Sequence, residues 1–137
     1  MKIILEVIPH NDQRYETVGD WFLDEQGNLV IRASKELGDG AKLVLVHELI
    51  EVLMCMADGI PQSWVDDFDI QFENWRKQGK VGPNDEPGDH HLAPYKRQHG
   101  FASSVERMLG AYLGVNWQAY ANLCETLKKT PTDENPH

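Results

Sequence analysis

The sequence predicts an α+β protein in which a small N-terminal antiparallel β-sheet is followed by about four α-helices. Apolar residues alternate with a period of two in the first third of the chain and recur with a helical period from Gly38 onward. Turn-rich segments with Gly or Pro separate the expected elements. A chain of 137 residues is long enough for one domain, which we place at residues 1–129, with a flexible C-terminal tail at residues 130–137.

Three strands are expected in the sheet. Residues 21–24 and 29–33 are two strands joined by a hairpin turn around Gly27. Residues 2–8 form another strand, whose alternation predicts one well-buried face made of Ile3, Leu5 and Val7.

Four helices are expected after the sheet, at about residues 39–57, 61–79, 94–113 and 117–128. A Gly- and Pro-rich loop, residues 79–94, precedes the third helix. The spacing of the third helix predicts a buried apolar face made of Phe101, Val105, Met108, Leu109 and Tyr112.

Charge and composition exclude several classes of partner. The formal net charge of −9 argues against nucleic acid, because phosphate binding relies on clustered Lys and Arg. No apolar run is long enough to span a membrane, and no signal peptide precedes the first strand. Cys55 and Cys124 are interpreted as reduced thiols of a cytoplasmic protein. The expected partner is a peptide or protein, and the oligomeric state is left open.

A polar stripe, His47-Glu48-x-x-Glu51, interrupts the otherwise apolar central helix. His47 and Glu51 are four residues apart, so their side chains project from successive turns of one helical face, which is the spacing that places two ligands on one metal. Glu48 lies beside them and is suited to deprotonate water. The alternative interpretation is a solvated helix edge that contains a histidine by chance.

A third metal ligand is expected from the third helix. His99 and Glu106 both lie at the edge of its apolar face but are two turns apart, and we prefer His99. The alternative for His99 is a boundary histidine hydrogen-bonded to a neighbour. His90 and His91 in the long loop could close over a site, and Asp69 on the second helix could hold a ligand histidine.

The segment Val46-His47-Glu48-Leu49-Ile50-Glu51, after a small sheet, resembles the His-Glu-x-x-His helix of the zincin metallopeptidases. In that family both histidines bind zinc and the Glu is the general base. The resemblance therefore implies a zincin-like fold, with His47 as a zinc ligand and Glu48 as the catalytic base. The sequence departs from the family at Glu51, where the second histidine would stand, so peptidase activity depends on a carboxylate replacing it.

The whole chain also resembles small phage and prophage proteins of unsettled activity, through Glu86-Pro-Gly-Asp89, Ala93-Pro-Tyr95, His99 and Leu113-Gly-Val-Asn-Trp117. The leading hypothesis is a zincin-like hydrolase of peptide or amide bonds. It would bind zinc, or else iron or manganese, through His47, Glu51 and His99.

Two alternatives stay open. The first is a non-enzymatic phage-type protein that binds a host or virion protein. The second is a magnesium-dependent nucleotide hydrolase that uses Glu48, Glu51 and Asp69.

Overall fold

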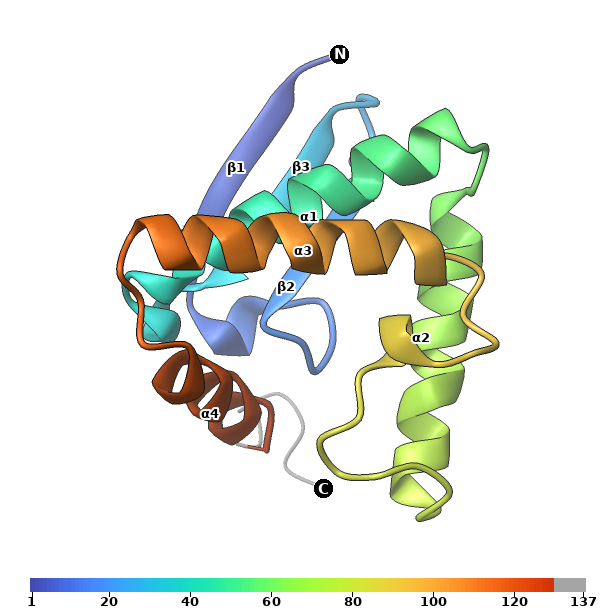
Figure 1. Ribbon diagram of the computed structural model, residues 1–137. Coiled ribbons are helices and arrows are strands. Elements are labelled where there is room, and N and C mark those ends of the chain that lie inside the picture. The colour runs from blue at the N-terminus through green and yellow to red at the C-terminus, as the bar shows by residue number, and fades with distance from the viewer. Residues whose placement is uncertain (130–137) are drawn as a thin grey trace.

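The computed structural model describes residues 1–129 and confirms the predicted α+β class, with a three-stranded sheet followed by four α-helices (Figure 1). The predicted tail at 130–137 lies outside the described residues. None of the helices in the described part is long and apolar enough to cross a membrane. The elements are β1 (Ile3–Ile8), β2 (Gly19–Leu23), β3 (Leu29–Ser34), α1 (Gly40–Ala57), α2 (Gln62–Lys77), α3 (Lys96–Tyr112) and α4 (Trp117–Lys129).

The strand order is β1-β3-β2. β2 and β3 form the predicted antiparallel hairpin. The prediction of a purely antiparallel sheet is wrong for β1, which pairs with β3 in parallel. The physical reason lies in β3, where Leu29, Val30 and Ile31 are consecutive and all buried. A strand that is apolar on both faces belongs in the centre of a sheet, so β3 lies between β1 and β2. The chain reverses direction between β1 and β2 and again in the hairpin, so β3 runs parallel to β1.

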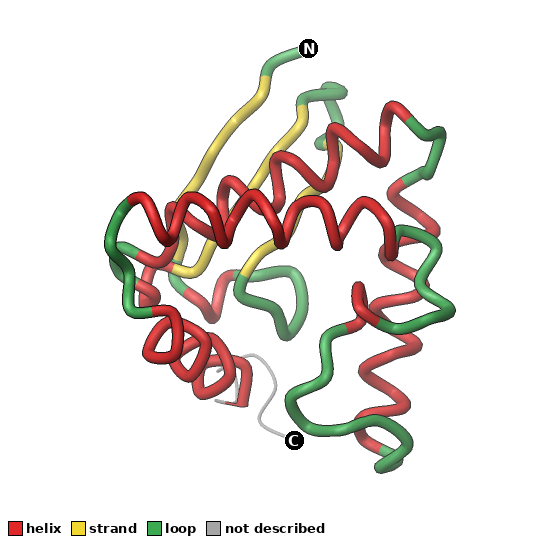
Figure 2. Tube along the Cα trace, in the orientation of Figure 1, coloured by secondary structure: helices red, strands yellow, loops and turns green. Residues whose placement is uncertain are grey.

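Helix α1 forms the middle layer of the protein. It packs against β3 and β2 on one side and against α3 on the other, and the tube view shows α1 and α3 running side by side across the sheet (Figure 2). A helix covered on two sides needs a broad apolar surface, which explains why most of α1 is apolar. Its buried residues are Gly40, Ala41, Leu43, Val44, His47, Glu51, Val52 and Cys55.

The expected burial of one face of the first strand is wrong. Ile3, Leu5 and Val7 remain 49%, 53% and 50% exposed. They pair with Leu29, Ile31 and Ala33, which are buried on the sheet face beneath α1. Because α1 lies over β3 and β2, it leaves the outer strand β1 largely uncovered.

The expected apolar face of the third helix is buried only in part, since Leu109 packs against the core and Val105 is half-buried. Phe101, Met108 and Tyr112 are 55%, 67% and 87% exposed. The face of α3 that is buried contains Gln98, His99, Ala102 and Gly110. A Cβ added at Gly110 would lie 3.7 Å from Leu43 of α1 and 3.2 Å from Trp117. Small residues therefore let α3 approach α1 closely, and this contact outweighs burial of the larger side chains.

Candidate metal centre

Helix α1 supplies two buried polar side chains to the interface with α3. His47 and Glu51 are only 7% and 5% exposed. They lie one helical turn apart on the same face, as their spacing predicts. Glu48 projects toward β2, where a Cβ added to Gly19 would lie 2.8 Å from its Oε1 atom. Glycine at position 19 therefore leaves the room that the Glu48 side chain occupies.

Helix α3 brings His99 to the same place. Its imidazole is 6% exposed and lies across from His47, with a ring-centroid distance of 4.7 Å. The ring also packs directly on the backbone of Gly88, since a Cβ at that position would lie 2.3 Å from the His99 ring. The helix and the loop that precedes it thus hold His99 on two sides.

Three potential ligand atoms converge between these side chains. Glu51 Oε2 lies 3.2 Å from His47 Nε2 and 3.0 Å from His99 Nδ1, and the two nitrogens are 3.2 Å apart. Electron pairs at such distances repel each other unless a cation, either a proton or a metal ion, lies between them. Ligands about 2.0–2.1 Å from a tetrahedral metal are themselves roughly 3.3 Å apart. The three atoms therefore fit three corners of a tetrahedral metal site.

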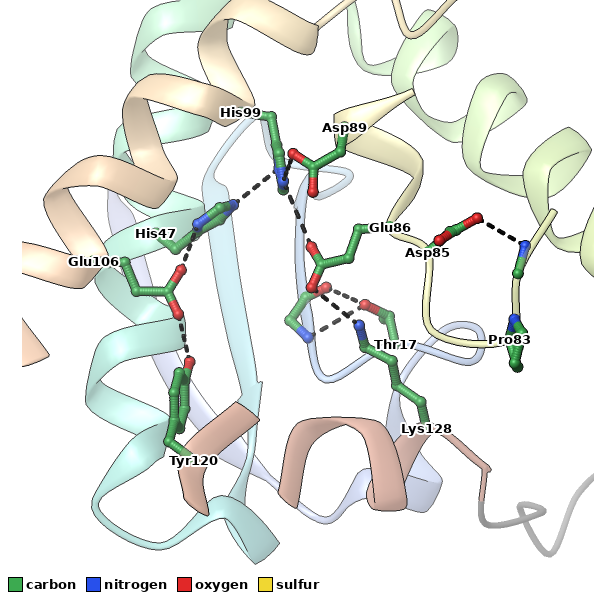
Figure 3. A network of polar contacts seen from close by, with 12 residues as sticks. Thr17, His47, Pro83, Asp85, Glu86, Asp89, His99, Glu106, Tyr120 and Lys128 are labelled. Atoms are coloured by element: carbon green, nitrogen blue, oxygen red, sulfur yellow. Dashed lines mark hydrogen bonds and ion pairs between the residues drawn. The ribbon is translucent and has the colours of Figure 1, made fainter. Parts of the chain in front are cut away.

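The other nitrogen of His47 has a carboxylate partner. His47 Nδ1 donates to Glu106 Oε1 at 2.8 Å, and Tyr120 donates to Glu106 Oε2 at 2.7 Å (Figure 3). Because a carboxylate only accepts, Nδ1 carries a proton, and loss of the proton on Nε2 would present that atom's electron pair to the cluster. A carboxylate that orients a histidine in this way is a regular feature of metal sites.

His99 has a similar environment with looser contacts. Its Nε2 atom is buried without a hydrogen-bond partner in the described part of the chain. It lies 3.5 Å from both Glu86 and Asp89, and Lys128 of α4 lies 3.5 Å from Glu86. Figure 3 shows these carboxylates beside the ring, on the side away from His47. A proton on Nε2 would face them and leave Nδ1 free to bind a metal.

The electrostatics of the cluster favour a cation. Burial alone would lower the pKa of His47, but hydrogen bonds to Glu106 and Glu51 outweigh it and raise this pKa to about 11. His99 behaves alike, since Glu51 and Glu86 outweigh burial and raise its pKa to about 10. Burial would raise the pKa of Glu51, yet the two histidines lower it to about 2. Trp21 also donates to Glu51 Oε1 at 3.2 Å.

A cavity of about 120 Å³ opens beside the three ligand atoms, and Glu48 lies in its wall. Burial and the nearby charge of Glu51 raise the pKa of Glu48 well above its ordinary value. The wall contains many carboxylates, namely Asp20, Glu48, Glu51, Asp66, Asp69, Glu86 and Glu106. Lys128 also lines the cavity, but the carboxylates outnumber it, so the cavity favours cations.

The other candidate residues lie apart from the cluster. His90 packs among Phe68, Phe72 and Trp75, and His91 stacks on it. Asp69 lines the cavity but accepts hydrogen bonds from Tyr15 and Tyr95. The described residues contain two groupings able to hold a metal, His47-Glu51-His99 and Glu86-Asp89-His99, and neither includes Glu48 or Asp69.

Sequence reasoning missed three contributors to the site. Trp21 lies in the predicted strand at residues 21–24, to which the sequence assigns no role in the site, yet its indole N–H donates to Glu51. The sequence gives no signal for Tyr120 or Glu86. Tyr120 contacts Glu106, 14 residues away in the chain, and Glu86 contacts His99, 13 residues away. Glu106 is left open by the sequence, and the structure places it behind His47 rather than in the cluster.

Asp69 leads to a prediction about the pH dependence of folding. Burial raises its pKa from 3.8 to about 7, against the opposing hydrogen bonds from Tyr95 and Tyr15. The folded protein therefore keeps this proton between pH 4 and 7 while the unfolded chain loses it, so stability falls as the pH rises through this window. An asparagine at this position stays neutral at every pH, so Asp69→Asn should abolish this decline in the free energy of unfolding. The decline amounts to a few kcal/mol, because each unit of pKa shift corresponds to about 1.4 kcal/mol. Urea unfolding at pH 4.5 and 7.5 measures this, and an unchanged pH dependence would contradict it.

Comparisons with models of protein families, with curated proteins and with solved structures found no match. The site is therefore interpreted from its own geometry.

Proposed function

We propose that the protein binds one divalent metal ion, preferably zinc, through His47 Nε2, Glu51 Oε2 and His99 Nδ1, and acts as a zincin-like hydrolase of peptide or amide bonds. The observation that carries this proposal is the convergence of the three atoms within 3.2 Å of one another. Two nitrogens and one oxygen are a common ligand set of catalytic zinc, and they leave a fourth position open. Iron and manganese suit the same ligands.

The reaction assigns a role to each residue of the site. A zinc ion supplies Lewis acidity, which activates water and polarises a substrate carbonyl. Glu48 stands beside the ligands in the wall of the cavity and takes the proton from the attacking water. Glu106 and Tyr120 hold the His47 ring in the tautomer that leaves Nε2 free. Trp21 holds the second oxygen of Glu51, so that Oε2 faces the histidines.

The proposal extends to the setting of the protein. A peptide or protein is the substrate or partner, because the net charge of −9 disfavours nucleic acid. A cytoplasmic location agrees with Cys55 and Cys124, which are both free. A phage or prophage origin stays part of the proposal on the sequence resemblance alone.

The decisive experiment is elemental analysis of natively purified protein, followed by zinc titration of the metal-free protein by calorimetry. The wild type should contain close to one zinc, iron or manganese ion per chain. His47→Ala and His99→Ala should each lose it while remaining folded by circular dichroism. His91→Ala is the matched control, because His91 is exposed and lies outside the cluster.

The outcomes separate the proposal from its alternatives. A protein that takes up no metal on titration would contradict the metal site. Zinc that binds at wild-type affinity in both histidine variants would contradict the ligand assignment. A zinc-loaded protein without hydrolysis of any peptide substrate would contradict the hydrolase and support a non-enzymatic binding protein.

A further inference from the structure

Strand β1 has one edge that no strand within residues 1–129 pairs with, and we call it the free edge. The strand pairs only with β3 among the described strands, and Figure 1 shows it at the outside of the sheet. Leu29 N–H donates to the carbonyl of Lys2 at 2.9 Å, so Lys2 directs its backbone toward β3. Successive residues of a strand direct their backbone N–H and C=O groups to opposite sides. Those of Ile3, Leu5 and Val7 therefore point outward, away from β3. Such an unpaired row is a template for another strand.

The free edge lacks the features that usually protect an edge strand. β1 contains no proline, and its pairing with β3 runs without interruption over six residues. Its outward residues Ile3, Leu5 and Val7 are apolar and about half exposed. The one acidic residue, Glu6, lies on the opposite face of the sheet and pairs with Arg32 at 3.0 Å. A partner strand would therefore meet only apolar side chains on one face, and Glu6 between Ile4 and Ile8 on the other.

We propose that a second copy of this chain pairs with this edge, β1 against β1 in antiparallel orientation about a two-fold axis, to form a continuous six-stranded sheet. The charges choose the register. With Ile4 opposite Ile4 of the partner subunit, Lys2 faces Glu6 of the partner subunit, and the symmetry repeats this pair. A shift by two residues would instead place Glu6 opposite Ile4 of the partner subunit.

The same arrangement covers the exposed apolar stripe. The two-fold axis is perpendicular to the sheet, so both α1 helices lie on one face, each above its own β3. Three strand spacings, roughly 14 Å, then separate the two β3 strands. The side chains of Ile3, Leu5 and Val7 from both copies fill the trough between the helices. Pairing thus buries apolar side chains that α1 leaves half exposed in a single copy.

Sedimentation velocity tests the proposal, which does not depend on the proposed metal chemistry. The wild type should sediment as a dimer of the 15.6-kDa chain at micromolar concentration. Leu5→Pro should raise the dimer Kd at least tenfold, because it removes an outward N–H and leaves the pairing with β3 intact. Lys2→Glu should weaken the dimer several-fold, and adding Glu6→Lys should restore it by re-creating the opposite-charge pair.

Cysteine cross-linking tests the register without disturbing the fold. Ile4→Cys would meet itself on the axis in a non-hydrogen-bonded pair, where Cα atoms lie about 4.5 Å apart and a disulfide can form. Ile8→Cys is the matched control on the same strand and face, and it has no partner cysteine nearby. Mild oxidation should cross-link Ile4→Cys much faster than Ile8→Cys or the wild type. A monomer at 100 µM, or equal cross-linking of the two variants, would overturn the proposal.

Discussion

Glu51→Gln is expected to remove most of the stabilisation that zinc gives to this protein. Glu51 supplies the only negative charge among the three proposed ligands and contacts both histidines. Zinc at a thousand times its Kd should stabilise the wild type by about 4 kcal/mol, which corresponds to a Tm increase of more than about 10 °C. If Glu51→Gln binds zinc a hundredfold more weakly, the same zinc concentration should stabilise this variant by only about 1.4 kcal/mol.

The measurement is thermal unfolding with and without zinc for each variant. The change in Tm on adding zinc is compared between variants, so any effect of the substitution on the metal-free protein cancels. This matters because Glu51 is buried between cationic partners, and its loss destabilises the metal-free fold as well. Glu73→Gln is a matched control, since Glu73 pairs with Arg76 on α2, outside the cluster. A full zinc response of Glu51→Gln would show that another group of residues holds the metal.

Glu48→Gln is expected to separate metal binding from hydrolysis. Glu48 lines the cavity but belongs to neither ligand grouping of the described residues, so the variant should take up zinc as the wild type does. Loss of a general base typically costs a factor of about 10² to 10⁴ in rate. Hydrolysis of a quenched fluorescent peptide mixture by the zinc-loaded protein should therefore fall at least a hundredfold.

The conservative variant Glu48→Asp sharpens this prediction, because it keeps a carboxylate in the cavity and should retain part of the activity. Elemental analysis of all three proteins is the control for metal content. Hydrolysis by Glu48→Gln at the wild-type rate would exclude Glu48 as the base. Loss of zinc from Glu48→Gln would instead indicate that this carboxylate is a ligand.

The elements of the fold were predictable because they depend on local periodicity. A period of two indicates strands and a period of 3.6 indicates helices, and both follow from backbone geometry within a few residues. The hairpin between β2 and β3 followed from a turn sequence. The pair His47 and Glu51 was predictable for the same reason, since residues four apart always share a helical face.

Tertiary structure alone decided which surfaces meet. The sequence indicated apolar faces on β1 and α3, yet Leu5 and Met108 are 53% and 67% exposed, because α1 leaves β1 largely uncovered and α3 turns another part of its surface toward α1. The small residues Ala102 and Gly110 allow close packing that turns the opposite face of α3 inward, and His99 comes with it.

The partners of the site are also long-range. Trp21 meets Glu51 across 30 residues, and Glu106 meets His47 across 59. No local rule connects such positions, because their distance depends on how whole helices and strands pack. The sequence by itself therefore determined the α+β class and the polar stripe on α1. Only the tertiary structure decided that β3 is central, that His99 completes the cluster and that one edge of β1 is unpaired within the described residues. These features depend on the free energy of packing whole helices and strands together.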